Sequence, residues 1–529
     1  MKHLFFALYL WFGAALSVYA QNLTFHNEIE ERAFEALDLE ALSLEQKIDF
    51  LLGVSANSNE LTVNYVQKRI KELLEKFPKN SASKNYKKLG KKLFKEVHEK
   101  FFRQYILNPS FNQIFEEGIY NCATASALYA VLLDELAIPY VIKATTNHVF
   151  IIIDADKEPI MLESTDPVNG LARVNKGSYV KMLKSMKVIS EEDAANYSND
   201  ELYTLYADQD EERISFKELV GVLYMNSAIK AYEEQRFEIG ARLIQKGIRL
   251  RPTEMNKHLR IMGLCGLLVD INYEDTTTLY PIVELLNYDL FKRELISSAL
   301  GAFHQHCTTY LRDEYKPEKY YPLYNYWMRN LDPEKHKDLY NEINYYHHFA
   351  QAVSPEHRDE QDRPTGVSLV HLDSAHYFRP SDKIIVDIIT SAIVELTYSF
   401  RDNPLELQQE ITTYQLKYPY VKDNHRLYGY QLDSWSHLVT SNFWSDDEAA
   451  GFEAYEKFMT FLDKKTLDRE EIQATVGSVY GSISSYYVRK KEEKTAKKWL
   501  IDGLKLAPDS EILNRKMQTF EAYELLYKD

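Results

Sequence analysis

The chain has 529 residues and a formal net charge of −16, with 45% hydrophobic and 27% charged residues. This length exceeds one ordinary hydrophobic core and predicts several domains, and the composition is that of a folded globular protein. The acidic balance excludes a general nucleic-acid binder, which needs surplus lysine and arginine to neutralise phosphates. The 39 tyrosines, against 18 glycines and 16 prolines, favour stacked amphipathic helices in which the ring packs and the hydroxyl reaches water.

The first twenty residues have the three parts of a signal peptide. Lys2 gives a positive start, Leu4–Ser17 is an apolar run, and Val18 and Ala20 occupy the two positions that a signal peptidase reads. The apolar run is short for a membrane span, which needs about 20 residues. We therefore expect cleavage before Gln21 and an exported protein, periplasmic or secreted, that does not span the membrane once the signal is removed.

Residues 21–104 are predicted to form a helical N-terminal extension. Ser43 and Gln46 have the spacing of a capping box ahead of an apolar run, which marks the start of a helix. Further along, apolar residues recur every four positions from Leu89 to Phe101, the pattern of one buried helix face. This helix is expected to extend over residues 84–105.

The next segment, residues 105–200, changes character. A compact helix is predicted from Cys122 to Leu136, and Ile138-Pro139 ends it. Short runs rich in β-branched residues follow, and their length favours strands over helices. The predicted strands cover residues 140–143, 148–154 and 160–165, so a helix followed by a small antiparallel sheet is expected here.

Cys122 is the candidate nucleophile. The chain has only two other cysteines, Cys265 and Cys307, whereas a disulfide-stapled exported protein normally carries a larger, even set; whether these two pair stays open. A thiol at a helix start faces the positive end of the helix dipole, which favours the thiolate. Unbonded backbone N–H groups there can also stabilise an oxyanion. The alternative is a small buried cysteine that only packs the helix on the sheet.

The two strands after this helix supply a base and a carboxylate. A hairpin with a loop of about five residues would place His148 opposite Asp166, and opposed residues share a face of the sheet. Glu163, the rival carboxylate, would then oppose Ile151 and point to the other side, because side chains alternate along a strand. Cys122, His148 and Asp166 are thus predicted to be nucleophile, general base and orienting group.

The motifs around these residues resemble the transglutaminase-like superfamily, in particular bacterial exported members that carry tetratricopeptide-like helices. The matching segments are Gly-Ile-Tyr-Asn-Cys-Ala-Thr-Ala-Ser-Ala-Leu-Tyr (118–129), Glu-Leu-Ala-Ile-Pro-Tyr (135–140), Asn-His-Val-Phe-Ile (147–151) and Leu-Glu-Ser-Thr-Asp-Pro (162–167). The resemblance covers roughly residues 100–190. It implies an α+β papain-like core over residues 105–200, acyl-enzyme chemistry and a Cys-His-Asp triad at Cys122, His148 and Asp166. Some members of this superfamily are thought to have lost activity and to act as binding modules.

Residues 213–529 are predicted to be an all-α helical-repeat region. The spacing of Tyr224, Ala228, Gly240, Gly247, Leu250 and Pro252 resembles the tetratricopeptide pattern, and it recurs as Tyr480, Ser484, Ala496, Gly503, Leu506 and Pro508. In this pattern small residues let paired helices approach and aromatic rings fill the gap. The repeats are clearest at 219–253 and 475–509, and the helices between them are expected to stack as well.

Two hypotheses for function follow. In the first, the protein is an exported cysteine hydrolase or acyltransferase that acts on peptide or amide bonds, and its helical repeats recruit a peptide or protein substrate or a protein partner. In the second, it is a non-catalytic interaction scaffold with a degenerate transglutaminase-like domain. We expect no cofactor, because glycine-rich phosphate loops are absent, and no metal, because His304, His306 and Cys307 do not share a helix face.

Overall fold

The computed structural model describes residues 23–77, 86–145, 148–154, 159–165, 171–173, 176–185, 189–206, 212–288, 290–462 and 469–526. The chain divides into two compact units, Met1–Ile271 and Asn272–Asp529. This division lies within the range 213–529 that the sequence analysis assigned to helical repeats. The expected signal peptide, residues 1–20, lies outside the described residues. Within the described part of the chain, every helix is too short or too polar to cross a membrane.

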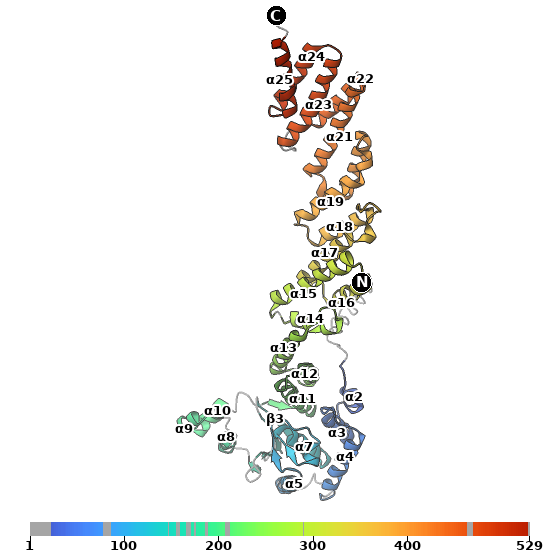
Figure 1. Ribbon diagram of the computed structural model, residues 1–529. Helices are drawn as coiled ribbons and strands as arrows, with labels where there is room; N and C mark the ends of the chain where they lie inside the picture. The colour runs from blue at the N-terminus through green and yellow to red at the C-terminus, as the bar shows by residue number, and fades with distance from the viewer. Residues whose placement is uncertain are drawn as a thin grey trace, which may run out of the picture. The chain divides into compact units, whose positions relative to one another are not determined.

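The first unit surrounds two small sheets with helices (Figure 1). Its helices are α2 (Glu28–Glu35), α3 (Leu44–Gly53), α4 (Glu60–Leu74), α5 (Tyr86–Phe101), α6 (Gln113–Glu116), α7 (Cys122–Glu135), α8 (Lys176–Ser185), α9 (Glu191–Asn196), α10 (Asn199–Tyr206), α11 (Phe216–Glu233), α12 (Phe237–Leu250) and α13 (Glu254–Leu267), followed by the 3-10 turn η2 (Leu268–Asp270). Its strands are β1 (Gln104–Tyr105), β2 (Ile119–Tyr120), β3 (Tyr140–Ala144), β4 (Val149–Ile153), β5 (Ile160–Leu162), β6 (Leu171–Arg173) and β7 (Glu212–Ile214).

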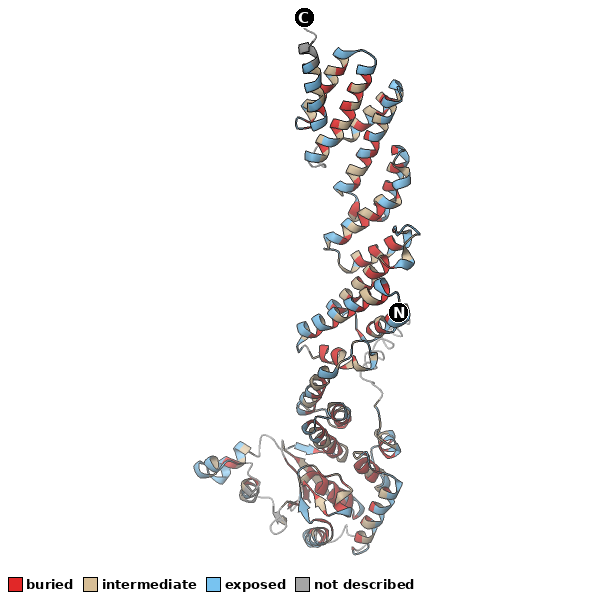
Figure 2. Ribbon diagram, viewed as in Figure 1, coloured by how far each residue is buried: buried red, intermediate tan, exposed pale blue. Residues whose placement is uncertain are grey.

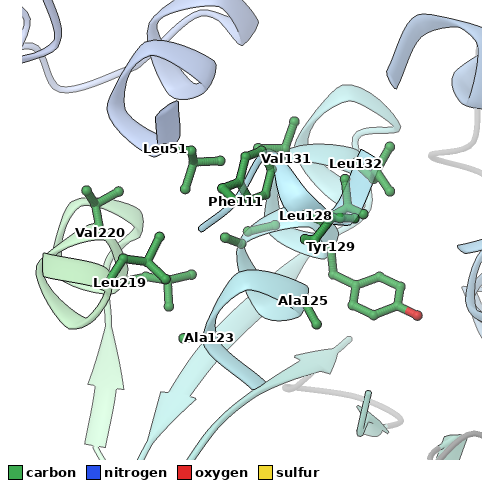
Figure 3. Close-up of a cluster of buried hydrophobic side chains, with 14 of the residues drawn as sticks. Leu51, Phe111, Ala123, Ala125, Leu128, Tyr129, Val131, Leu132, Leu219 and Val220 are labelled. Carbon is green, nitrogen blue, oxygen red and sulfur yellow. The ribbon is translucent and has the colours of Figure 1, made fainter. Parts of the chain in front are cut away.

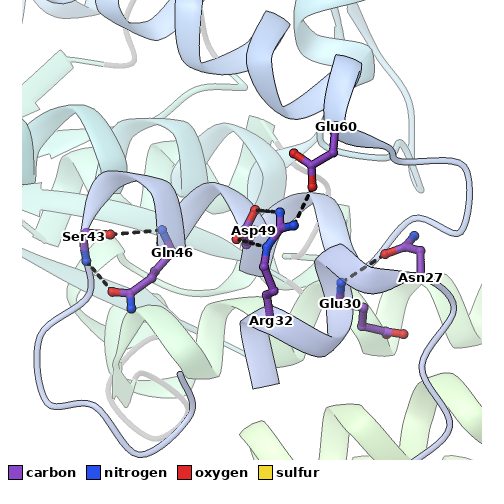
Figure 4. Close-up of polar contacts among 7 residues, drawn as sticks. All are labelled: Asn27, Glu30, Arg32, Ser43, Gln46, Asp49 and Glu60. Carbon is purple, nitrogen blue, oxygen red and sulfur yellow. Dashed lines mark hydrogen bonds and ion pairs between the residues drawn. The ribbon is translucent and has the colours of Figure 1, made fainter. Parts of the chain in front are cut away.

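Side-chain caps and ion pairs fix the N-terminal helices (Figure 4). The predicted capping box is present: the Ser43 hydroxyl accepts from the Gln46 N–H, and the Gln46 side chain accepts from the Ser43 N–H, so α3 begins at Leu44. On α2, Arg32 donates to both carboxylate oxygens of Asp49 at 3.2 Å and to Glu60 at 2.5 Å. Three consecutive helices are thereby held together by one guanidinium group.

A buried ion pair connects α2 to α12. Lys246 Nζ lies 2.7 Å from Glu30 Oε1, and the exposed fractions of the two side chains are 1% and 0%. The Tyr224 hydroxyl on α11 donates to the same oxygen at 2.6 Å. Because charges removed from water need partners, the N-terminal helix and the first predicted repeat depend on each other for this pairing.

The larger sheet has the strand order β6-β5-β4-β3-β7, with every neighbouring pair antiparallel. Strands β4 and β5 lie within two of the runs that the sequence indicated as strands, and β3 covers the run 140–143 and extends to Ala144. The smaller sheet pairs β1 with β2 in parallel, with Gln104 beside Ile119 and Tyr105 beside Tyr120. Residues just before the cysteine helix therefore lie against residues that precede them by about fifteen positions.

Helix α7 is the centre of the first unit. It packs on β4 and β3 on one side and on α3, α4 and α11 on others, and its residues from Ala123 to Leu133 are all buried. Figure 3 shows its side chains among Leu51 of α3 and Leu219 and Val220 of α11, and Figure 2 shows the same helix as an almost continuous buried segment. Burial on all sides holds the N-terminal end of α7 rigidly in place.

The second unit consists of helices and short helical turns. They are η3 (Thr276–Thr278), α14 (Tyr280–Leu286), α15 (Lys292–His306), the π-helical η4 (Cys307–Asp313), α16 (Pro317–Asn330), α17 (Lys337–Ala352), η5 (Pro355–His357), α18 (Gly366–Phe378), α19 (Lys383–Leu396), η6 (Tyr398–Phe400), α20 (Pro404–Lys417), η7 (Pro419–Val421), α21 (His425–Trp444), α22 (Glu448–Phe461), α23 (Arg469–Arg489), α24 (Glu493–Leu506) and α25 (Glu511–Leu526).

Both predicted repeats are helix pairs, α11 with α12 and α23 with α24. The tyrosine and glycine of the pattern meet in each pair: a Cβ on Gly247 would lie 3.5 Å from Tyr224 Cβ, and one on Gly503 would lie 2.8 Å from Tyr480 Cβ. The second separation is below ordinary van der Waals contact, so only glycine fits there. Small residues at these positions do allow the helices to approach, as the pattern indicated.

The predicted fold class is wrong in one respect. The structure is 72% helical and 5% strand, its sheets are small, and its character is that of helical repeats, so a papain-like α+β core is not shown. The sequence signals for individual strands were sound, but strands of two to five residues form only a minor sheet. The long helices that surround this sheet contribute most of the core, which no local strand pattern reveals.

Candidate active site

The sequence at residues 121–124 fixes where α7 begins. The Asn121 side chain accepts from the Thr124 N–H at 2.8 Å, and the Thr124 hydroxyl accepts from the Asn121 N–H at 3.0 Å. The Asn121 amide also donates to the Leu107 carbonyl at 2.6 Å. This capping box makes Cys122 the first residue of the helix, next to unbonded N–H groups. Taken as a whole residue, Cys122 is of intermediate exposure.

His148 and Glu163 form a buried pair beside the sheet. His148 Nε2 lies 2.6 Å from Glu163 Oε2, and the two side chains are 1% and 2% exposed. The other carboxylate oxygen accepts from the Thr165 N–H at 2.9 Å and from the Thr165 hydroxyl. With both oxygens bonded, the carboxylate holds the imidazole in one orientation.

The strand register explains why Glu163 rather than its neighbours meets His148. The predicted hairpin placed Asp154 opposite Ile160, whereas Ile153 pairs with Ile160 and Ile151 with Leu162. Asp154 adopts a left-handed conformation with φ 50° and bonds the Pro139 carbonyl at 3.0 Å, outside the ladder. A one-residue shift moves alternate side chains to the other face, so the predicted orientation of Glu163 was wrong. Asp166 lies outside the described residues.

The Cys122 thiol and the His148 ring shift each other's pKa. Burial by itself would raise the pKa of Cys122, but a hydrogen bond and charge interaction with His148, together with the Val149 N–H, lower it. Burial lowers the pKa of His148, but Glu163 and the Cys122 thiolate raise it to about 10. Nε2 is bonded to Glu163, and the buried Nδ1 has no hydrogen-bond partner among the described residues, the Cys122 sulfur included. Nδ1 is therefore the nitrogen available to the sulfur.

The other two cysteines differ in this respect. Burial raises the pKa of Cys265 and raises the pKa of Cys307 to about 12. All three cysteines lie in the described part of the chain, and none of them forms a disulfide. Among them, only Cys122 has a pKa shifted toward the reactive thiolate.

Tyr105 is a member of the site that the sequence did not indicate. Its pairing with Tyr120 in the parallel sheet brings the phenol to Cys122. Burial, the charge of Cys122 and hydrogen bonding with its thiol raise the pKa of Tyr105, and the Cys122 backbone lowers it. The residue as a whole is 43% exposed. No local signal singles it out, because its position depends on a pairing between distant residues.

A glycine permits this pairing. Gly118, just before β2, has φ 76°, and its carbonyl accepts from the Arg103 N–H at 2.8 Å and from the Gln104 N–H at 3.1 Å. A Cβ at this position would lie 2.7 Å from Arg103 Cγ. Both the left-handed backbone and the close approach favour glycine, so the turn before the cysteine helix requires it.

His98 contacts the backbone of the residue that follows Glu163. Its Nε2 lies 3.1 Å from the Ser164 carbonyl, and its Nδ1 lies 2.9 Å from the Phe94 carbonyl. The contact ties α5 to the segment that carries Glu163. No group of three or more histidine, cysteine, aspartate or glutamate side chains that could hold a metal occurs among the described residues.

Comparisons with known proteins add little. No family model and no curated protein matches the chain. A solved structure of menin, described as revealing the binding site for the Mixed Lineage Leukemia (MLL) protein, aligns at 12% identity over 71% of this chain and 94% of the menin chain, with a TM-score of 0.27. At this score the likeness carries no argument about fold or function.

Proposed function

We propose that the protein is a cysteine hydrolase or acyltransferase acting on amide bonds of peptides or proteins. Cys122 is the nucleophile, His148 the general acid and base, and Glu163 the group that orients His148. The observation that carries this proposal is the buried 2.6 Å contact of His148 with Glu163, and the lowering of the Cys122 pKa by His148 supports it. Nucleophile, base and orienting carboxylate are the three groups that such chemistry requires.

The reaction follows from the proton positions. The Cys122 thiolate attacks the carbonyl carbon of the amide, and the imidazolium of His148 gives its proton to the nitrogen as the C–N bond breaks. The amine leaves and an acyl thioester remains on the sulfur. Water, or a second amine, then gives up a proton to His148 and attacks the thioester, which releases an acid or a new amide and restores the thiolate and the imidazolium.

The first test is selective alkylation of the full chain by iodoacetamide at pH 7, followed by mass spectrometry of the cysteine peptides. We expect Cys122 to react at least about tenfold faster than Cys265, because its lowered pKa gives a larger thiolate fraction. Cys265 serves as the control within the same sample. In His148→Ala the interaction that lowers the pKa is lost while burial remains, so the advantage of Cys122 is expected to disappear.

Two results would contradict the proposal. One is a Cys122 that reacts no faster than Cys265 across pH 6–9, and the other is a His148→Ala variant that reacts as fast as the wild type. Either result would favour the second hypothesis of the sequence analysis, an interaction scaffold without catalysis.

Tyr105 has a role in this chemistry. When the thiolate attacks, the carbonyl oxygen gains charge close to the Cys122 N–H, and the phenol of Tyr105 lies near enough to this backbone for it to lower the phenol pKa. The exposed phenol can yield this position and donate its O–H to the same oxygen. Two donors aimed at one developing charge make an oxyanion hole.

Tyr105→Phe is expected to lower turnover of a peptide p-nitroanilide by about 10²-fold, the usual effect of removing one oxyanion donor. Alkylation by iodoacetamide forms no oxyanion, so its rate at Cys122 should stay within about threefold of the wild type. The pair of measurements separates the two steps. A variant with faster alkylation and unchanged or faster turnover would instead identify Tyr105 as a cover over the thiol.

A further inference from the structure

A cavity of about 250 Å³ opens among α21, α23 and α25 in the second unit. The residues that define its chemistry are Trp444, Ser478, Ser482, Ser485, Arg489 and Lys516. No aspartate or glutamate is among the residues that line it. In a chain with a net charge of −16, a cavity lined by cations and hydroxyls without an acidic side chain is unusual.

Lys516 brings an unbalanced positive charge to this cavity. Its ammonium donates to the Ser485 hydroxyl at 2.5 Å, and no carboxylate of the described residues lies within ion-pair distance of it. Burial lowers the pKa of Lys516, the response of a cation that has lost water without gaining an anion. A bound carboxylate would remove this cost.

Arg489 differs because its charge is already matched. It donates to the Phe443 carbonyl at 2.5 Å and to Asp446 at 3.1 Å, and its guanidinium lies 5.3 Å from the Trp444 ring centroid. The arginine therefore holds the indole in place. One positive charge, that of Lys516, is left for a ligand, which fits a singly charged carboxylate better than a doubly charged phosphate.

Hydroxyl groups also line the cavity. Ser478, Ser482 and Ser485 follow one another at spacings of four and three on α23, so they share one face of the helix. Ser485 donates to the Gly481 carbonyl at 2.9 Å. The hydroxyls of Ser478 and Ser482 make no hydrogen bond with another residue that the structure describes, so both are available to a ligand.

An apolar surface adjoins the polar wall. Trp444 is 78% exposed and Ile512 is 44% exposed, and both line the cavity. Large exposed apolar side chains beside convergent polar groups are typical of binding sites. A free carboxylate ion would leave this surface uncovered, whereas a peptide would place a side chain on it.

We propose that this cavity binds a peptide through a carboxylate, with the carboxylate at Lys516 and the serine hydroxyls and a neighbouring apolar side chain on Trp444. The carboxylate can be the C-terminus of the peptide or an aspartate or glutamate side chain. The site is independent of Cys122, and its test measures binding alone, so its outcome does not depend on the proposed catalysis.

The experiment uses the full chain and three synthetic probes: acetyl-Leu-Asp with a free C-terminus, its C-terminal amide, and acetyl-Leu-Asn-amide, which has no carboxylate. Binding is followed by calorimetry and by the fluorescence of Trp444, with Trp444→Phe to assign the signal. We expect both carboxylate probes or one of them to bind saturably and the uncharged probe to bind at least about tenfold more weakly. The two carboxylate probes distinguish a C-terminus from a side chain.

Lys516→Gln is expected to weaken binding by about ten- to hundredfold, as for other hydrogen bonds to charged groups, while Lys516→Arg keeps it within about fivefold. Lys505→Gln on α24, whose exposed lysine pairs with Asp502, is the matched control and should change nothing. Equal binding of all three probes, no saturable binding up to about 10 mM, or an unaffected Lys516→Gln variant would overturn the proposal. Preferential binding of acetyl-Leu-phosphoserine-amide would overturn it in favour of a phosphopeptide site.

Discussion

Glu163→Gln is expected to lower turnover of an amide substrate by about 10³–10⁴-fold, whereas Asp166→Asn is expected to change it by less than about threefold. Glu163 accepts from His148 Nε2 at 2.6 Å and is 2% exposed, so its carboxylate fixes the ring and stabilises the imidazolium. A glutamine of the same shape keeps the packing and removes the charge. The neighbouring carboxylate, Asp166, serves as the matched control.

The pH profile gives this prediction a second readout. Glu163 is a main cause of the raised pKa of His148, about 10 in the folded protein. The imidazolium is needed to protonate the leaving amine, so activity should fall as pH rises through that value. In Glu163→Gln the pKa of His148 falls, and the alkaline limb moves to lower pH. A limb that moves with Asp166→Asn instead would transfer the orienting role to Asp166.

Removing one partner of the buried pair between Glu30 and Lys246 is expected to cost about 3–5 kcal/mol of unfolding free energy, because the remaining charge is left unpaired out of water. The exposed fractions of 0% and 1% and the shared contact with Tyr224 motivate this value. Glu30→Gln and Lys246→Met are measured by guanidinium unfolding of the full chain. Each transition is fitted separately, since the chain has two units.

Two controls make the stability prediction specific. Glu238→Gln breaks an exposed pair with Arg242 on the same helix and should cost less than about 0.5 kcal/mol. The double variant Glu30→Gln, Lys246→Met leaves no unpaired charge, so it should be more stable than the sum of the single variants predicts. Single costs below about 1 kcal/mol that simply add would show that the two charges do not depend on each other.

The sequence predicted local features of the fold better than its class. The capping box at Ser43 and Gln46 and the cysteine helix follow from contacts within one or two turns. The helix pairs at Tyr224 and Tyr480 follow from a residue pattern that spans two neighbouring helices. The balance between sheet and helix depends on packing between distant segments. Helix α7 illustrates this, because helices from both before and after it in the chain cover it.

The candidate site divides in the same way. Cys122 and His148 were named from a helix start and a strand start, which are local features. The sequence placed the Glu163 side chain on the wrong face of the sheet, because the left-handed conformation of Asp154 shifts the β4–β5 register by one residue from the predicted one. Tyr105 was assigned to the end of a helix that in fact stops at Phe101, and its contact with Cys122 arises from pairing with a distant segment.

The connection between β4 and β5 also bears on how related chains should be compared. Its length sets the register of β5 on β4 and so decides which carboxylate meets the imidazole. Inserting or deleting one residue there would turn the side chains of β5 to the opposite face of the sheet. A homologue could then retain cysteine, histidine and glutamate in an alignment and still lack the contact between the histidine and the glutamate. For this group of chains, the spacing of the connection is a better marker of chemistry than the identity of the three residues.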